Sequence, residues 1–121
     1  MNAVTETSLP LPLFQRGKVR DVYDLGNELL LVSSDRISAF DFVLPSGVPQ
    51  KGSVLNRMSA FWFRQTNHII PNHMMVSIED VDALEQLVVR LELDHPLPTS
   101  LINRSMIAKK ARRVPVECIL R

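Results

Sequence analysis

The stretch Arg16-Gly17-Lys18-Val19-Arg20-Asp21-Val22-Tyr23 gives the clearest indication of the fold. It leads into a strand-like segment at Lys18–Asp24, which is followed by turn residues at Leu25–Glu28 and by a second strand-like segment at Leu29–Ser33. Two such segments joined by a short turn that contains glycine predict a β-hairpin. The second segment begins with four consecutive apolar residues, a pattern typical of a strand that is covered on both faces.

The same stretch also contains a candidate ligand site. Gly17 has no Cβ, so the backbone can approach a ligand closely there. Lys18 and Arg20 are two residues apart, which in an extended strand places both side chains on one face. A glycine beside two cations suits a polyphosphate. The alternative is an edge strand whose cations prevent pairing with another sheet.

The remaining segments favour an α+β fold with a mainly antiparallel sheet and two helices, because connections of the hairpin type dominate. Residues 1–13 are polar or rich in proline, and we expect a loose arm there. Ser53 is expected to cap the first helix, whose apolar face includes Met58 and Trp62. The other expected elements are an extended segment at Ile37–Leu44, a loop at Pro45–Gly52, a first helix from Ser53 to Thr66–His68, a strand at Met74–Ser77, a second helix from Val81 to about Leu93, and strands at Ser105–Lys110 and Val114–Arg121.

Composition limits the classes of function. The chain has 121 residues, 45% hydrophobic and 22% charged, which are values of one globular domain. A formal net charge of +1 gives no basic excess for nucleic acid, and no apolar run is long enough for a membrane span. One cysteine, Cys118, cannot form an internal disulfide, and we expect it to be a small core residue. The sequence therefore predicts a cytoplasmic protein without a nucleic-acid or membrane partner.

A second polar constellation follows the hairpin, at Ser34–Asp41. It has more hydrogen-bonding groups than a simple connector needs, with Asp35, Arg36 and Ser38 among them. Arg36 can grip a carboxylate or phosphate through two parallel hydrogen bonds. The alternative is a turn that satisfies itself, in which Asp35 or Ser38 bonds to nearby backbone. The residues alone leave both interpretations open.

Near the C-terminus, the densest basic cluster is most simply a solvated face, although one of its lysines can bind phosphate. Its members are Lys109, Lys110, Arg112 and Arg113. Glu117 lies in an apolar run, where a buried carboxylate needs partners. The three histidines lack the spacing of metal ligands, and no metal site is predicted.

Taken together, three blocks resemble the phosphoribosylaminoimidazole-succinocarboxamide synthase (SAICAR synthetase) family. The first is Arg16–Tyr23 and the second is Ser34–Asp41, with Gly52 and Phe61-Trp62-Phe63 following it. The third is Val114-Pro115-Val116-Glu117-Cys118-Ile119-Leu120-Arg121. They occur in the family's order, from about Phe14 to the last residue. The resemblance implies an N-terminal ATP-binding lobe at residues 14–121, similar to the small lobe of protein kinases.

The resemblance also implies an activity: an ATP- and Mg²⁺-dependent ligase of purine biosynthesis. Such an enzyme joins L-aspartate to carboxyaminoimidazole ribonucleotide, and ADP and phosphate leave. Carried onto this sequence, the resemblance makes Gly17, Lys18, Val19 and Arg20 cover the nucleotide phosphates and Val116, Glu117 and Cys118 line the adenine pocket. Arg121 corresponds to an arginine that grips the ribonucleotide phosphate, while Asp35, Arg36 and Ser38 shape the substrate end. No catalytic residue is assigned.

The sequence departs from the family after Arg121, its last residue. The family continues to a Gly-Ser pair and later to an Asp-x-Lys-x-Glu-x-Gly block, and neither is present, so we expect the C-terminal domain to be absent and the chain to be inactive alone. A surface that would meet that domain is expected to be apolar and to favour self-association into a homo-oligomer. The alternatives are a non-catalytic nucleotide-binding module and a purely structural domain.

Overall fold

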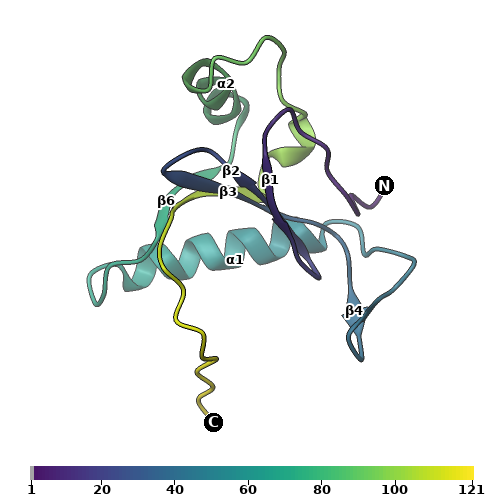
Figure 1. Ribbon diagram of the computed structural model, residues 1–121, viewed down its shortest axis with the longest axis vertical. Helices are drawn as coiled ribbons and strands as arrows, with labels where there is room; N and C mark the ends of the chain where they lie inside the picture. The colour runs from purple at the N-terminus through teal and green to yellow at the C-terminus, as the bar shows by residue number, and fades with distance from the viewer. Residues whose placement is uncertain (1) are drawn as a thin grey trace.

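The structure is a computed structural model that describes residues 2–121, with a five-stranded antiparallel sheet at its centre (Figure 1). The strand order is β1-β2-β3-β7-β6, and two helices and a small hairpin surround the sheet. The elements are β1 (Leu13–Arg16), β2 (Arg20–Asp24), β3 (Glu28–Ser33), β4 (Ser38–Ala39), β5 (Phe42–Val43), α1 (Lys51–Thr66), β6 (Met74–Ile78), α2 (Val81–Arg90), the 3₁₀ helix η1 (Thr99–Leu101) and β7 (Ser105–Lys109). The α+β class with an antiparallel sheet is confirmed.

One face of the sheet carries the apolar core. Tyr23 on β2 lies opposite Leu30 on β3, which lies opposite Ile107 on β7. Alternate residues of a strand point to the same face, so these three side chains form a layer that α2, η1 and the segments around them cover. The buried members of this core are Tyr23, Leu30, Val32, Ile78, Leu84, Leu87, Leu97, Leu101 and Ile107.

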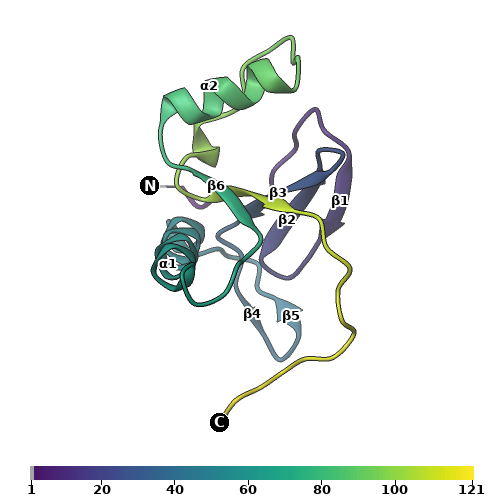
Figure 2. The ribbon, with the colours of Figure 1, turned by 90° about the vertical axis from the view of Figure 1, so that its left-hand side faces the viewer.

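Helix α1 crosses the opposite face, as Figures 1 and 2 show. It packs through a seam of small and polar residues, because Gly52, Asn56 and Ala60 are its buried positions. A Cβ at Gly52 would lie 2.0 Å from the carbonyl oxygen of Ser33, so only glycine fits there. Asn56 Nδ2 donates to the carbonyl oxygen of Asn103 at 3.1 Å. The seam brings the helix axis close to the sheet.

The apolar face expected on this helix is present, but it points to solvent. Met58 and Trp62 are more than half exposed. The expected start at Ser53 is also wrong: α1 begins at Lys51, and Gln50 before it adopts a left-handed φ of 69°. A carboxylate replaces the serine hydroxyl, since Asp35 Oδ1 accepts from the Gly52 N–H at 2.9 Å. A negative charge is favourable at a helix N-terminus.

The second helix, α2, agrees better with the prediction from the sequence. Asp80 caps it, and its Oδ1 accepts from the Ala83 N–H at 2.8 Å. Leu84 and Leu87 are buried on its inner face. The helix ends at Arg90, three residues before the expected end at Leu93.

Residues 2–12 form no helix or strand, but hydrogen bonds tie them to the rest of the fold. The Val4 N–H donates to Asp35 Oδ2 at 2.8 Å, and the Thr7 N–H donates to Asp21 Oδ2 at 2.9 Å. Two buried carboxylates therefore hold a segment whose sequence carries no pattern of regular structure.

The strand expected at Val114–Arg121 is wrong. These residues form no strand, and the chain leaves β7 and runs away from the sheet (Figure 2). Both neighbours of β7 in the sheet, β3 and β6, come from earlier in the chain, so Val114–Arg121 do not pair with the strand that they follow. Cys118 is exposed and not a core residue. Within residues 2–121, no helix has the length and apolar content needed to cross a membrane.

Candidate functional site

The site begins with the loop that joins β1 to β2, residues 17–19. The Gly17 N–H donates to the carbonyl oxygen of Arg20 at 2.8 Å, which closes a tight turn. Lys18 lies in this loop and not in the strand, which begins at Arg20, so the argument that both cations share a strand face is wrong. The ammonium group of Lys18 forms an ion pair with Asp41 in the turn between β4 and β5.

Arg20 is on the same sheet face as an open apolar surface. Val22 follows it at a spacing of two, and Leu31 lies opposite Val22 on β3. Arg20 and Leu31 both line a small cavity of about 90 Å³ beside α1. The guanidinium group of Arg20 therefore lies at one end of the apolar surface, the end nearer to α1.

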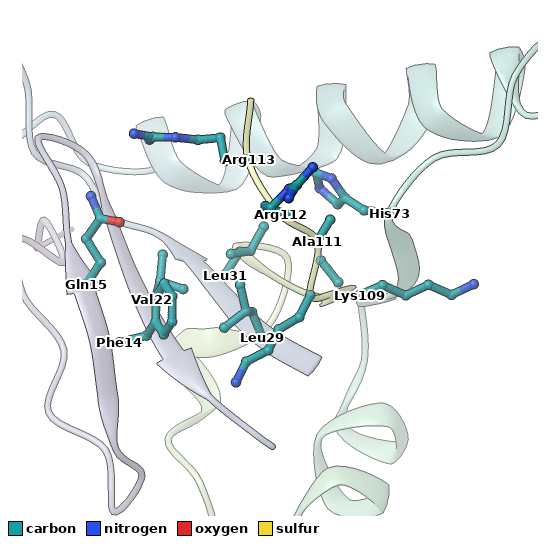
Figure 3. A pocket seen from close by; sticks show the side chains of 12 residues that line it. Phe14, Gln15, Val22, Leu29, Leu31, His73, Lys109, Ala111, Arg112 and Arg113 are labelled. Atoms are coloured by element: carbon teal, nitrogen blue, oxygen red, sulfur yellow. The ribbon is translucent and has the colours of Figure 1, made fainter. Parts of the chain in front are cut away.

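Beyond that cavity lies a pocket with a volume of about 830 Å³ (Figure 3). Its floor is apolar, and its rim carries cations of β7 and the segment that follows. This size is within the range of small-molecule sites. The lining residues are Phe14, Gln15, Val22, Leu29, Leu31, His73, Ala108, Lys109, Lys110, Ala111, Arg112 and Arg113. Four of them form the basic cluster that the sequence singled out.

The expected adenine-lining residues Val116, Glu117 and Cys118 are outside this pocket, whose lining ends at Arg113. They are exposed, as is Arg121. The structure therefore does not bring the third sequence block together with the Gly17 loop. Ser38, at the start of β4, is half-buried and close in sequence to Asp41. The roles assigned to these residues stay predictions.

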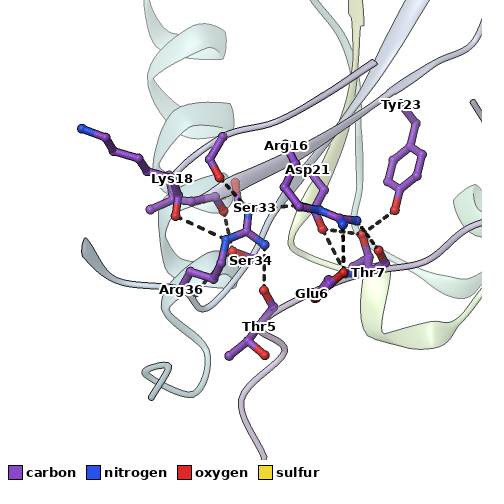
Figure 4. A network of polar contacts seen from close by, with 12 residues as sticks. Thr5, Glu6, Thr7, Arg16, Lys18, Asp21, Tyr23, Ser33, Ser34 and Arg36 are labelled. Carbon is purple, nitrogen blue, oxygen red and sulfur yellow. Dashed lines mark hydrogen bonds and ion pairs between the residues drawn. The ribbon is translucent and has the colours of Figure 1, made fainter. Parts of the chain in front are cut away.

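A buried polar network lies behind the loop (Figure 4). Asp21 is fully buried on the core side of β2, where Arg16 Nε and Arg36 Nη2 each donate to its Oδ1 at 2.9 Å. Thr7 donates to its Oδ2 through both its N–H and its hydroxyl. Burial alone would raise the pKa of Asp21, but the hydrogen bonds from Thr7, Arg36 and Arg16 outweigh it and hold the pKa below its ordinary value.

Asp35 is the centre of a second buried network. Arg104 Nη1 donates to its Oδ1 at 2.9 Å, in addition to the N–H groups of Val4 and Gly52 already described. Burial opposes ionisation here too, and the bonds from Arg104, Val4 and Gly52 lower the pKa of Asp35 below its ordinary value. Arg36 and Asp35 thus have internal partners, but these are distant in sequence and not the nearby backbone that a self-satisfied turn would use.

Sequence reasoning missed Asp21, Arg104 and Thr7 as members of these networks. Asp21 gave a usable signal, because it shares a strand face with Tyr23, a core residue. A charged residue at such a position needs an opposite charge nearby. Arg104 and Thr7 gave no such signal, since their partners are distant in sequence.

No group of three or more His, Cys, Asp or Glu side chains in the described part of the chain is arranged to hold a metal ion. The candidate site consists of a tight loop, an apolar pocket and a cationic rim. It suits a ligand with a flat apolar part and a negatively charged part.

Comparison with known proteins identifies relatives over almost the whole chain. The phosphoribosylaminoimidazole-succinocarboxamide synthase of Geobacter metallireducens is 48% identical over 122 residues, which cover 99% of this chain and 38% of the relative. The enzyme of the same name from Pelobacter propionicus is 50% identical over 119 residues, with 98% and 38% covered. The chain thus spans 38% of the length of these relatives.

Solved structures agree. The SAICAR synthase of Saccharomyces cerevisiae, in complex with SAICAR, is 34% identical with a TM-score of 0.71, covering 89% of this chain and 37% of that one. A second structure named SAICAR synthase is 34% identical with a TM-score of 0.74, covering 93% and 39%. A family model described as SAICAR synthetase matches residues 13–121. With the fold, the relatives and the family model in agreement, the chain belongs to the SAICAR synthetase family.

Proposed function

We propose that this chain supplies the nucleotide-covering lobe of a ligase of purine biosynthesis, which uses ATP to join L-aspartate to carboxyaminoimidazole ribonucleotide and releases SAICAR, ADP and phosphate. The observation that carries the proposal is the apolar pocket on the sheet face that Arg20 and Val22 share. Such an enzyme works in the cytoplasm on small-molecule substrates. Family membership and the names of the relatives support the reaction class.

The pocket suits the adenosine part of the nucleotide. Val22, Leu29, Leu31 and Ala108 form an apolar floor wide enough for a flat base, and Val116–Cys118 are proposed to complete it when the C-terminal segment folds back. Lys18 in the loop and Arg20 on the same face as Val22 are proposed to contact the phosphates. Backbone and cationic donors of this kind stabilise the charge of a transferring phosphoryl group.

The reaction needs such help because a carboxylate is a poor acyl donor. ATP converts it to an acyl phosphate, which the aspartate amine attacks as phosphate leaves. This chain contributes positioning and charge neutralisation. Arg121 and Ser38 are proposed to lie at the ribonucleotide end. Mg²⁺ is proposed to arrive bound to the nucleotide phosphates, whose charge it would partly neutralise.

The test is a calorimetric titration of the chain with Mg-ATP. We expect saturable binding that Val22→Trp abolishes, because the indole fills the pocket, and that Val89→Trp preserves, because Val89 is exposed on α2. A wild-type chain without saturable heat contradicts the proposal and favours a purely structural domain.

A second candidate is a non-catalytic nucleotide-binding module. It is favoured by one observation, the presence of a pocket without a carboxylate cluster in the described residues. Aspartate-dependent ADP release distinguishes the two when the chain is assayed together with the remaining part of a relative. Turnover supports the ligase, and binding without turnover in that mixture supports the module.

A further inference from the structure

Arg36 contacts the 17–19 loop from inside the protein. Its Nη2 donates to the carbonyl oxygen of Gly17 at 3.0 Å, and its Nε donates to the carbonyl oxygen of Lys18 at 3.3 Å (Figure 4). The next carbonyl oxygen, that of Val19, accepts from the Ser34 hydroxyl at 2.6 Å and from the Ser34 N–H at 2.9 Å. Three consecutive carbonyl groups of the loop are therefore bound from the interior.

This arrangement fixes where the loop amides point. In a trans peptide, the C=O of one residue and the N–H of the next point in opposite directions within one plane. With the carbonyl groups of Gly17 and Lys18 directed inward, the N–H groups of Lys18 and Val19 are directed to the opposite side of the loop. Successive backbone N–H groups that face one side form a concavity that favours an anion.

Arg36 itself is not placed to touch a ligand. Its side chain is 10% exposed, and it also donates to the carbonyl oxygen of Thr5 at 2.7 Å and to Asp21 at 2.9 Å. A buried guanidinium needs an opposite charge, which the fully buried Asp21 supplies. A lysine cannot replace it, because an ammonium group lacks the rigid planar array of donors.

We propose that Arg36 is a positioning residue for nucleotide phosphates: held by Asp21, it fixes the carbonyl groups of Gly17 and Lys18 so that the loop N–H groups face the phosphates. This inference rests on the proposed function. It replaces the expected direct contact of Arg36 with substrate by an action through the loop.

Arg16 provides a matched control, since it also donates to Asp21 Oδ1 at 2.9 Å. Its other bonds go to Thr7 and Glu6 and not to the loop carbonyls. Arg36→Met and Arg16→Met therefore each remove one cation from the same carboxylate, and only the first releases the loop.

The experiment is an NMR titration of the wild-type chain and both variants, with Mg-ATP and separately with adenosine. We expect Arg36→Met to weaken Mg-ATP binding about tenfold or more and to change adenosine binding less than about twofold. Arg16→Met should change neither by more than about twofold. An equal loss of Mg-ATP affinity in both variants, or a parallel loss of adenosine affinity, overturns the inference.

Two further measurements keep the test decisive. If Arg36→Met does not fold, Arg36→Lys replaces it. We expect this variant also to lose affinity for Mg-ATP and to keep its affinity for adenosine. Amide hydrogen exchange at Gly17, whose N–H bond to the Arg20 carbonyl oxygen closes the loop, should be faster in Arg36→Lys than in Arg16→Met without nucleotide. If the wild-type chain binds neither ligand, the proposed function fails, whereas unchanged exchange in Arg36→Lys shows that Arg36 does not hold the loop.

Discussion

The ammonium group of Lys18 forms an ion pair with the carboxylate of Asp41, and this pair joins the loop between β1 and β2 to the turn between β4 and β5. Both side chains are more than half exposed, so water screens the pair and little free energy opposes its opening. The hydrogen bond from Lys18 lowers the pKa of Asp41 below its ordinary value. Asp41 therefore competes, as an anion, with any phosphate for Lys18.

Removing the competitor should strengthen nucleotide binding. We expect Asp41→Asn to tighten Mg-ATP binding about two- to threefold, because an exposed ion pair is weak, and Lys18→Ala to weaken it. Glu79→Gln is the control, since it removes one exposed carboxylate that pairs with Arg64 on α1. Calorimetric titration of the three variants measures the effect. An equal gain in Glu79→Gln would show that net charge alone is responsible.

Alanine substitutions at two hairpin glycines, Gly17 and Gly26, should have opposite effects on Mg-ATP binding and on stability. A Cβ at Gly17 would lie 3.7 Å from the Arg20 carbonyl oxygen, an ordinary contact, so the fold tolerates alanine there. We expect Gly17→Ala to change the free energy of unfolding by less than about 0.5 kcal/mol and to weaken Mg-ATP binding, because the methyl group meets the ligand.

Gly26 has a φ of +100°, so Gly26→Ala should destabilise the fold by about 1 kcal/mol and leave nucleotide binding unchanged. Urea unfolding and titration of both variants provide the comparison. If Gly17→Ala binds Mg-ATP as the wild type does, the phosphates do not approach this glycine.

The sequence predicts the antiparallel hairpin and the second helix well, because each depends on local patterns: turn residues between β2 and β3, and Leu84 and Leu87 at helical spacing on α2. It misjudges α1, because periodicity locates an apolar face but does not show which face packs on the sheet. The packing face of α1 is set by Gly52 and Asn56. The small size of the glycine lets the helix approach the sheet closely, and the amide of the asparagine donates a hydrogen bond across the contact.

In the candidate site, too, features that are local in sequence could be predicted and long-range contacts could not. The Gly17 loop and the cations beside the pocket are local in sequence, and both were singled out. The bonds from Arg36 to the loop carbonyls and from Arg104 to Asp35 join residues 18 to 69 positions apart. Sequence patterns do not pair such residues, because the sheet brings them together only when all its strands have formed.

The buried carboxylates predict how stability depends on pH. The pKa of Asp21 and that of Asp35 are both lower in the folded chain than their ordinary values, so the unfolded chain takes up protons first as the pH falls. Their contribution to stability is complete above the ordinary aspartate pKa of about 3.9 and is lost as the pH falls below it, through the folded pKa values.

Urea unfolding between pH 7 and pH 3 should therefore show falling stability in the acid range. Asp21→Asn should lower the free energy of unfolding by about 3 kcal/mol at pH 7, because it leaves Arg36 without its buried counter-charge. Its acid dependence should be shallower than that of the wild type. An unchanged slope would show that Asp21 does not bind fewer protons in the folded state.

The outer face of α1 predicts self-association. This face carries four apolar side chains that are each 50–57% exposed: Val54, Met58, Phe61 and Trp62. The ring centroids of Phe61 and Trp62 lie 5.1 Å apart in an edge-to-face arrangement. Contiguous exposed apolar side chains of this kind favour burial against another surface, and a second copy offers the same stripe.

We expect the apparent mass from light scattering to rise with concentration. Met58→Glu with Trp62→Glu should abolish the rise, whereas Val89→Glu, at a single exposed valine on α2, should not. A wild-type chain that stays monomeric at high concentration contradicts this prediction, and equal effects of the two changes would locate the contact elsewhere than on α1.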